Sequence, residues 1–482
     1  MQFKYSRLLP TPSYSYLALT SSAISILATA LDRGAVNIVL PNISERFSTD
    51  IPTVQWVSVI YLLLVAVLLL PMGRLSDIVG KKKVIVAGLI TFTAGGFLCS
   101  ISPYFWTLLF GRLLQGVGGA MIQGTSFSIA VDSFGENQRG KSIGLVLIFV
   151  GIGNILGPAI GGTIASIAGW RSVFIFTSLI TTFGVLLASI TLRNESSDNG
   201  KIEGLDWIGT FFCIFMLISL LLGITMTTQT RFGFLNSYIF YVASFLFALL
   251  FIWRSLNTEN PILEIRLFAK PIFALSVTAN LLCFVGMGSI LFLLPFYLRY
   301  VQGLDPIEVG SVFIPAAIAM SIISPISGRL SDRFGNSFFT TGGLISCAIG
   351  LSILSTLDET SPIWLPYLAV IPASAGMGAF YGPNNSATLS QSNEQTQGAV
   401  IGFINLVRNS GNLISIPISV VLVTATMESM GFRPDLSIVT NNSDPDLLKS
   451  FMKGMNTSFI VLAATTTVGA IISLYRPKAL TE

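Results

Sequence analysis

The sequence predicts an all-α integral membrane protein with fourteen transmembrane helices, arranged as two pseudo-symmetric six-helix bundles and an inserted helix pair. Of the 482 residues, 52% are hydrophobic and 10% are charged, and the mean hydropathy is +0.76. A soluble fold could not bury so much apolar surface. Apolar runs of about 18 to 25 residues recur along the chain. The pentapeptide Gly-Arg-Leu-Ser-Asp occurs at residues 73–77 and again at residues 328–332.

Each apolar run is long enough to cross a bilayer core as a helix. Backbone amides in hydrocarbon need partners within their own segment, and strand-like alternation is absent, so helices are expected. The first run follows Lys4 and Arg7 but continues to Pro41 without a small-residue cleavage site, which favours a retained span over a signal peptide. The expected spans are 16–41, 53–72, 84–102, 105–130, 141–166, 171–192, 206–226, 236–254, 272–298, 308–328, 338–356, 363–388, 398–425 and 456–475.

An even number of spans places both termini on one side of the membrane. If that side is cytoplasmic, about 17 basic residues fall inside and about 7 outside, as the positive-inside rule requires. We therefore expect a multi-pass protein of the cell (plasma or inner) membrane with both termini in the cytoplasm. The net charge of +4 is spread through the loops, so no nucleic-acid partner is expected. The lipid bilayer is the expected partner of a monomeric chain.

The two halves of the sequence are related by a repeat. The pentapeptide copies are 255 residues apart, and an offset of 258 pairs glycines of the fourth, fifth, twelfth and thirteenth spans, such as Gly118 with Gly376 and Gly153 with Gly411. The repeat predicts a first bundle at 1–192, an inserted pair with its linkers at 193–270, and a second bundle at 271–482. The longest polar segment, about 428–453, is predicted to be an external loop between the last two spans.

A duplicated bundle can hold a binding site on the axis between its copies and open it alternately to either side, so the repeat predicts a transporter. An enzyme is disfavoured because the chain has no histidine, no clustered metal ligands and no nucleophile-base pair. No cofactor or metal is expected. A non-transporting sensor would need a signalling domain, which the sequence does not show. The four cysteines lie in apolar runs and are interpreted as core residues: Cys99, Cys213, Cys283 and Cys347.

The repeated pentapeptide is expected to form a charged loop that breaks and remakes as the bundles move. Its glycines allow two helix ends to approach closely, and its aspartate can cap the next helix or pair with neighbouring lysines. An ordinary solvated loop is the alternative, which the second copy disfavours. The residues assigned to this role are Gly73, Arg74, Asp77, Gly80, Lys81, Gly328, Asp332 and Gly335.

With these motifs the chain resembles the major facilitator superfamily over essentially its whole length. Residues 73–83 are similar to the family's signature between the second and third helices, and residues 328–335 to its echo in the second half. Residues 111–120 are similar to the arginine motif and residues 153–162 to the motif associated with antiporters. Residues 31–41, the segment 206–209 and the fourteen spans resemble the fourteen-helix drug:proton antiporter branch.

This resemblance implies the major facilitator fold and proton-coupled export of small amphipathic compounds, of the multidrug efflux type, by alternating access. Small molecules and protons would be the partners. An uncoupled carrier or an importer of a specific metabolite has the same fold and is kept as the alternative.

Asp32 lies well inside an apolar helix, where an unpaired carboxylate is disfavoured by about 2.5 to 3.5 kcal/mol. It must therefore pair, protonate or face water. Arg112 could hold it ionised until a proton or a substrate displaces the pair, and the resemblance gives Arg112 a role in proton transfer. The alternatives are a fixed ion pair that only locks helices together, and an arginine that satisfies backbone carbonyls at a kink.

Arg33 departs from the family pattern, in which the position beside the acid is uncharged. It lies eight residues before Pro41, so it either snorkels toward water or faces the site between the bundles. In the second case the site carries surplus positive charge with Arg112 and Arg408, which disfavours cationic substrates and favours neutral or anionic ones.

Polar and glycine residues within the spans complete the expected site. Gly157 and Pro158 are expected to kink the fifth span, and the neighbouring glycines to flatten a face that either seals the protein against leak or simply packs closely. That motif comprises Gly153, Gly157, Pro158, Gly161 and Gly162. Polar side chains on membrane helices line a cavity or join helices. Those expected to line the substrate cavity are Arg33, Asn37, Gln115, Gln123, Asn154, Asn280, Asn384, Asn385, Asn405, Arg408 and Asn412.

Overall fold

The computed structural model of the chain describes residues 12–134, 139–193, 206–226, 233–258, 265–391, 397–433 and 445–475. Within these residues the regular structure is helical and contains no strand, which confirms the predicted fold class. The elements are α1 (Pro12–Phe47), α2 (Ile51–Val54), α3 (Trp56–Val79), α4 (Lys81–Ser100), α5 (Phe105–Phe134), α6 (Arg139–Ala168), α7 (Trp170–Thr191), α8 (Trp207–Met226), α9 (Gly233–Asn257), η3 (Ile265–Ala269), α10 (Pro271–Met287), α11 (Ile290–Tyr300), α12 (Pro306–Ser311), α13 (Ile314–Phe334), α14 (Asn336–Leu354), α15 (Trp364–Leu389), α16 (Gln397–Ser429) and α17 (Pro445–Leu474).

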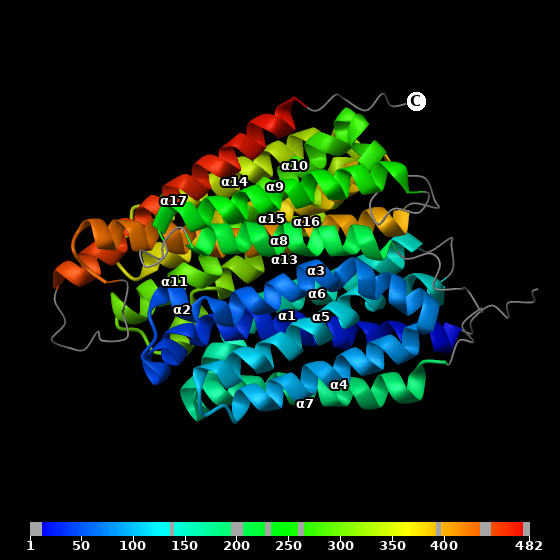
Figure 1. Ribbon diagram of the computed structural model, residues 1–482, viewed down its shortest axis with the longest axis horizontal. Coiled ribbons are helices and arrows are strands. Elements are labelled where there is room, and N and C mark those ends of the chain that lie inside the picture. Colours follow the sequence, from blue (N-terminus) through cyan, green and yellow to red (C-terminus); the bar gives the residue numbers. More distant parts are fainter. Residues whose placement is uncertain are drawn as a thin grey trace, which may run out of the picture.

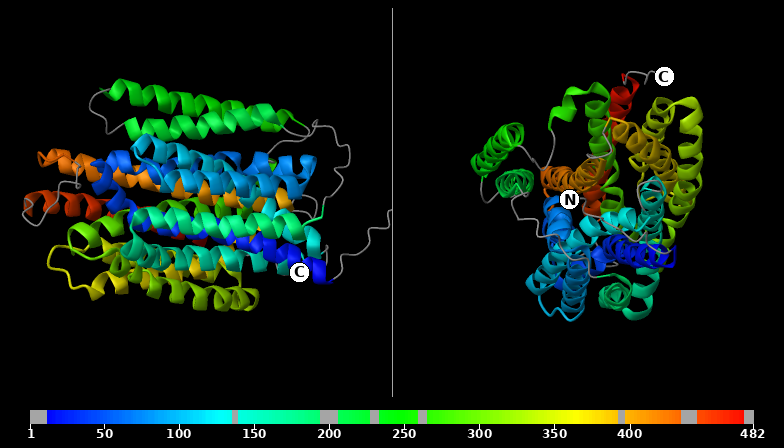
Figure 2. Two further views of the ribbon diagram at one scale, coloured as in Figure 1. Left: turned by 90° about the horizontal axis from the view of Figure 1, so that it is seen from below. Right: turned by 90° about the vertical axis from the view of Figure 1, so that its right-hand side faces the viewer.

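The long helices run roughly side by side along the molecule (Figure 1). The first helix begins at the right of Figure 1, and the last helix, α17, runs from the left toward that side. In the right-hand view of Figure 2 the start of the first helix and the end of α17 both point toward the viewer. Thirteen helical segments of the described residues are long and apolar enough to cross a membrane. The remaining expected span forms α15, which is long enough but less apolar because it carries Asn, Ser, Pro and Gly residues.

Three expected spans are each broken into two helices. The breaks separate α2 from α3, α10 from α11, and α12 from α13. Asp50 caps the short α2 by accepting a hydrogen bond from the backbone N–H of Thr53 at 2.9 Å, and Asp305 and Glu308 form a capping box at α12. Asp50 and Asp305 are 255 residues apart, like the pentapeptides, so both halves begin this span with the same capped turn.

Two expected loops are shorter than predicted. The last helix begins at Pro445, so residues 445–453 of the predicted external loop are helical, whereas residues 434–444 lie outside the described residues. The pentapeptides also belong to helices, since α3 continues to Val79 and α13 to Phe334. After each of these two helices one glycine with positive φ turns the chain into the next helix. These glycines are Gly80, with φ of 106°, and Gly335, with φ of 87°.

Helix packing repeats between the two halves. In the first half α1 packs on α6, α4 on α5, α3 on α5 and α4 on α7. In the second half the equivalent pairs are α10 with α16, α14 with α15, α13 with α15 and α14 with α17. The close crossings also match: a Cβ added at Gly118 would meet the carbonyl of Gly88, and one added at Gly376 would meet the carbonyl of Gly343. Glycine is needed at both crossings because backbone lies against backbone there.

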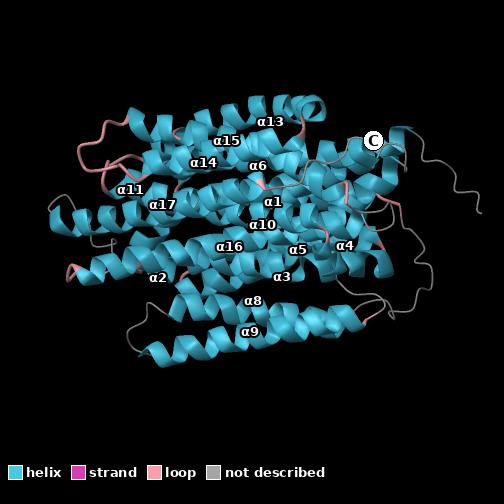
Figure 3. Cartoon of the chain, turned by 90° about the horizontal axis from the view of Figure 1, so that it is seen from above, coloured by secondary structure: helices cyan, strands magenta, loops and turns pink. Residues whose placement is uncertain are grey.

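The inserted helices α8 and α9 pack on each other and lie at one side of the molecule (Figure 3). Of the two, α8 touches both α3 and α16, one helix from each half. Asp206 begins α8 by accepting a hydrogen bond from the backbone N–H of Gly209, and the same oxygen pairs with Arg254 of α9 at 3.0 Å. This helix pair therefore covers the seam between the two bundles on that side.

The two halves pack on each other through α3 and α16, and they also meet at the end of the molecule formed by the last turns of α1 and by α11 and α12, here called the closed end. There α1 packs on α11, and α6 packs on α12. Arg299 of α11 pairs with Glu45 of α1 at 3.4 Å, and the hydroxyl of Tyr300 donates to the carbonyl of Pro41 at 3.2 Å. Polar bonds therefore join the bundles at this end.

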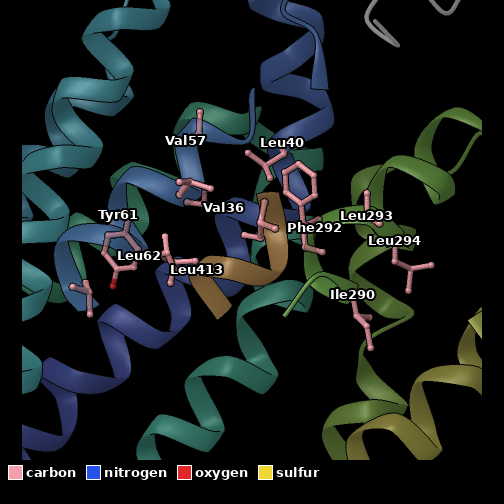
Figure 4. Close-up of a cluster of buried hydrophobic side chains, with 14 of the residues drawn as sticks. Val36, Leu40, Val57, Tyr61, Leu62, Ile290, Phe292, Leu293, Leu294 and Leu413 are labelled. Atoms are coloured by element: carbon pink, nitrogen blue, oxygen red, sulfur yellow. The ribbon is translucent and has the colours of Figure 1, made fainter. Parts of the chain in front are cut away.

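An apolar layer lies next to these bonds on the side toward the middle of the molecule. Val36 and Leu40 of α1 belong to one buried cluster with Phe292 of α11 and Leu413 of α16 (Figure 4). All four side chains are at most 1% exposed. Burying apolar side chains from both halves together stabilises the closed end and excludes water from it.

Candidate functional site

The predicted acid and arginine meet inside the first bundle. Asp32 of α1 is fully buried, and its Oδ2 accepts a hydrogen bond from Arg112 of α5 at 2.7 Å. Its Oδ1 accepts further bonds from the amide of Gln115 at 3.2 Å and from the hydroxyl of Thr177 of α7 at 3.1 Å. Two helices, α5 and α7, therefore place three donors around one carboxylate of α1.

Arg112 is 1% exposed and uses its guanidinium in four directions. Besides Asp32, Nη1 donates to Oε1 of Gln115 at 2.7 Å, and Nε donates to the carbonyl of Val57 in α3 at 2.8 Å. The guanidinium carbon also lies 4.5 Å from the centre of the Tyr61 ring. A buried ion pair recovers its desolvation cost only with such additional bonds. Arg112 thus does both things considered from the sequence: it pairs with the acid and satisfies a backbone carbonyl.

Arg33 is directed at the second bundle rather than away from it. Its Nη2 donates to Oδ1 of Asn409 in α16 at 3.4 Å, across the boundary between the two halves. It also interacts electrostatically with Tyr61 and with Arg408, the residue before Asn409. Arg408 in turn donates to the hydroxyl of Tyr381 in α15 at 3.0 Å. Two arginines, one from each half, therefore lie near enough to repel each other beside the buried ion pair.

Several buried polar atoms near these arginines have no hydrogen-bond partner among the residues that the structure describes. A buried polar atom without a partner costs about 1 to 3 kcal/mol, and most proteins pair more than 90% of such atoms. The atoms are the Nε of Arg33 and Arg408, the Nδ2 of Asn409, and the Oδ1 of Asn280, Asn385 and Asn405. These six residues are here called the interface cluster.

Contacts and helix spacing connect the members of the interface cluster. Asn405 lies about one turn before Arg408 on α16, and Asn385 lies one turn after Tyr381 on α15. On α10, Asn280 lies one turn before Phe284, whose ring packs edge-on against Tyr381 with centroids 5.8 Å apart. The cluster thus draws on α1, α10, α15 and α16.

The remaining polar residues expected to line a cavity lie in different surroundings. Asn37 is buried and accepts a hydrogen bond from Ser58 of α3 at 2.7 Å, and Asn384 donates to the carbonyl of Ser276 in α10 at 3.1 Å, so both join helices of one bundle. Gln123 is buried in α5. Asn154 and Asn412 are partly exposed.

The glycine motif of α6 packs along the segment of α1 that carries the acid. Added Cβ atoms at Gly153, Gly157 and Gly161 would meet the backbone of α1. One at Gly162 would instead meet Pro306 of α12 in the second half. This face of α6 therefore closes against α1 and against the other bundle.

In the repeated pentapeptides, Ser76 donates to the carbonyl of Gly73 and Ser331 to that of Gly328, at 2.6 and 2.8 Å. Arg74 is exposed and Lys81 partly buried. The pairings expected of Asp77 and Asp332 fall on side chains outside the described part of the structure.

Sequence reasoning missed Thr177 and Tyr61, which both contact the ion pair. Thr177 is one of several hydroxyl residues along α7 that face inward (Ser178 and Thr181 are also fully buried), and this hydroxyl pattern was the available signal. Tyr61 gave no signal, because an aromatic residue on an apolar helix is usually core.

Two related helical bundles, which meet around a buried acid and a polar cluster, define the chain as a membrane transporter of the duplicated-bundle class. The chain belongs to the Major Facilitator Superfamily, which it matches over residues 22–416.

The riboflavin transporter RibZ of Clostridioides difficile (strain 630) is 30% identical over 460 residues, which cover 95% of this chain and 97% of that protein. The methylenomycin A resistance protein of Streptomyces coelicolor is 26% identical over 86% of this chain and 87% of its own length. Among solved structures, a bacterial homologue of the human lysosomal transporter Spinster, in an inward-facing and unoccupied conformation, matches with a TM-score of 0.70. That match covers 97% of both chains at 18% identity and is a likeness of fold.

Proposed function

We propose that this chain is a proton-coupled secondary transporter that exports small amphipathic molecules by alternating access, with Asp32 as its protonation site. The observation that supports this most directly is a carboxylate with no exposure that depends on one arginine and two neutral donors. Protonation of Asp32 would release Arg112 from its charge partner, which changes the field felt by the neighbouring Arg33. The proton site and the boundary between the bundles are thereby connected.

One such site is energetically sufficient. Moving one elementary charge through 100 mV yields about 2.3 kcal/mol, which is enough for roughly a fiftyfold substrate gradient per proton. Relatives named for antibiotic resistance, such as the methylenomycin A resistance protein, support export as the direction. The grouping of helices supports a first bundle at 1–192, an inserted pair at 193–270 and a second bundle at 271–482. We place the chain as a monomer in the cell membrane, with both termini in the cytoplasm.

Uptake of a specific metabolite is the second candidate, and Arg33 favours it. A cation competes with the proton for Asp32, which gives exchange. An anion held by arginine binds more tightly once Asp32 is neutralised, because the repulsion from the carboxylate is removed. The anion and the proton therefore bind cooperatively and travel together. The likeness to a riboflavin transporter also supports a carrier of one metabolite. Riboflavin flux into proteoliposomes, measured with the pH gradient in each direction, separates the two candidates.

The protonation site is tested by the Asp32→Asn variant, which keeps an acceptor for Arg112 but cannot carry the proton. We expect it to abolish substrate movement driven by an imposed pH gradient in proteoliposomes, while folded protein remains in the membrane. Riboflavin, ethidium and anthraquinone-2-sulfonate serve as neutral, cationic and anionic probes. Asp206→Asn is the matched control, because Asp206 is also a buried, arginine-paired acid but lies in the inserted pair. Unchanged gradient-driven flux in Asp32→Asn would show that the proton is carried elsewhere.

A further inference from the structure

We propose that the interface cluster is the substrate site and that it takes an anionic amphipathic molecule, whose negative group binds between Arg33 and Arg408. This inference rests on the second candidate above, proton-coupled uptake, because an anion binds together with the proton, and it adds the charge class of the substrate. It concerns equilibrium binding, so it can be tested without a proton gradient.

The charge balance in the middle of the molecule supports an anion. Arg33, Arg112 and Arg408 lie well inside spanning helices, and Asp32 is the acid placed comparably deep. Asp32 already holds Arg112 at 2.7 Å. Arg33 and Arg408 therefore repel each other, and their hydrogen-bond partners, Asn409 and Tyr381, are neutral. Arg33 also interacts with the phenol of Tyr61 and, through space, with Asp32, whose charge Arg112 already pairs. A negative group placed between them relieves the repulsion between the bundles and pairs both charges.

The geometry of the two guanidiniums suits such a group. Arg33 comes from α1 and Arg408 from α16, so a ligand held by both would bridge the two halves. The contact from Arg33 to Asn409 is long, at 3.4 Å, and the Nε of each arginine donates no hydrogen bond to any group in the described part of the chain. A guanidinium presents Nε and Nη as a fork that matches the oxygens of a carboxylate, sulfonate or phosphate. The unpartnered Nε atoms are the free halves of these forks.

The rest of the cluster suits an amphipathic body with hydrogen-bonding edges. Asn280, Asn385 and Asn405 offer buried acceptors, and Asn409 offers a buried donor. Beside them, the paired rings of Phe284 and Tyr381 offer an aromatic surface. A planar ring system with both donors and acceptors can satisfy the amides while it stacks on one of these rings, which stand edge-on to each other. On the side of the closed end, the buried apolar layer limits how far a charged group can reach.

A different role for the two arginines makes a distinct prediction. Their repulsion alone could push the bundles apart during transport, without binding any anion. In that case substitution of either arginine would alter transport but would leave the preference among ligands unchanged. Binding measurements on ligands of opposite charge therefore decide between an anion-binding site and a pair of arginines that acts only by repulsion.

The test uses two planar aromatic probes of one shape and fixed, opposite charge: anthraquinone-2-sulfonate and the corresponding trimethylammonium compound. Calorimetry on the purified full chain in detergent should show the sulfonate binding at least about tenfold more tightly. Arg33→Gln and Arg408→Gln should each weaken sulfonate binding by about tenfold or more, as expected for loss of a charged hydrogen bond. Arg408→Lys, which keeps the charge but not the fork, should retain part of the affinity.

Arg254→Gln is the control, because Arg254 lies in the inserted pair and pairs with Asp206. It should bind the sulfonate like the natural chain. Thermal unfolding of each variant identifies any that fail to fold, and the lysine variant then carries the test. Equal affinity for both probes, tighter binding of the cation, no detectable sulfonate binding, or arginine variants that bind the sulfonate normally would each overturn the inference. The Asp32→Asn flux experiment is unaffected by these outcomes, so the two proposals can fail separately.

Discussion

At the residue scale, the duplication preserved glycines but not charges. A Cβ added at Gly153 would meet the carbonyl of Leu27, and one added at its repeat equivalent Gly411 would meet that of Leu281, so α1 and α10 correspond with an offset of 254. By this offset the position of Asp32 corresponds to Gly286 in the second half, and by the offset of 258 Arg112 corresponds to Val370. Close helix packing is required in both halves, so the glycines are kept in both. The ion pair of Asp32 and Arg112 has no charged equivalent in the second half. The ion pair belongs to the first half, and most of the interface cluster belongs to the second.

The ion pair predicts strongly non-additive effects on stability. Arg112→Leu should lower the free energy of unfolding by about 3 to 5 kcal/mol, because it leaves the Asp32 carboxylate buried without a partner. Adding Asp32→Asn should recover a large share of this loss, although the additional bond to the carbonyl of Val57 is not restored. Thermal and denaturant unfolding in detergent measure the free energies of the two single variants and the double variant, which together form a double-mutant cycle. The equivalent cycle at Arg254 and Asp206 should show weaker coupling, because Arg254 is 31% exposed. Additive effects at Asp32 and Arg112 would contradict the pairing.

The sequence allowed the Asp32 and Arg112 pair to be predicted, because charges inside apolar runs are rare and must find partners. It did not allow the contact of Thr177 with Asp32 to be predicted, since the two residues are 145 positions apart and a threonine on a membrane helix carries no charge that demands a partner. The direction of Arg33 also had to come from the structure. Whether a side chain points at water or at Asn409 depends on how the bundles pack, which helical spacing within α1 does not determine.

At the scale of elements, apolar length predicted the spanning helices, and the repeat predicted which pairs correspond. The breaks between α2 and α3, α10 and α11, and α12 and α13 were not predicted. Both sides of each break are apolar, and hydropathy does not report a change of helix direction. The pentapeptide was expected to form a loop since it is charged. Charged residues at a membrane surface can equally extend a helix, and only the positive φ of Gly80 and Gly335 ends it.

Two adjacent glycines of α14 give a matched test of helix crossing. A Cβ at Gly343 would lie 2.6 Å from the carbonyl oxygen of Gly376 and 2.8 Å from the backbone nitrogen of Phe380, whereas one at Gly342 would meet nothing within 4 Å. Gly343→Ala should therefore force α14 and α15 apart and cost about 1 to 3 kcal/mol. Gly342→Ala should be neutral or stabilise the helix by up to about 1 kcal/mol. Thermal unfolding of the two variants in detergent measures the difference, and equal effects would contradict the crossing.

At the scale of the whole molecule, the junction between the halves is layered from the middle toward the closed end. The interface cluster comes first, the apolar layer around Val36 and Phe292 follows, and the bonds of Glu45 and Tyr300 come last. The repeat in the sequence indicated that two bundles would face each other. It could not indicate at which end the apolar layer and the polar bonds between α1 and α11 would form, because a repeated chain is compatible with closure at either end.

Alternating access requires the closed end to open, so locking it should stop transport. Glu45 and Arg299 reach each other from different halves, and their side chains are 35% and 28% exposed, which makes cysteines at both positions reachable by a reducible bifunctional thiol reagent. The four natural cysteines are buried and should not compete. We expect cross-linking of the Glu45→Cys and Arg299→Cys double variant to abolish riboflavin or anthraquinone-2-sulfonate flux in proteoliposomes, and a reductant to restore it. Each single variant, treated in the same way, should keep its flux, since one ion pair at a partly exposed position contributes about 1 kcal/mol or less to closure. Full flux through a chain whose cross-link is verified by mass would mean that the two halves do not separate at this end during the transport cycle.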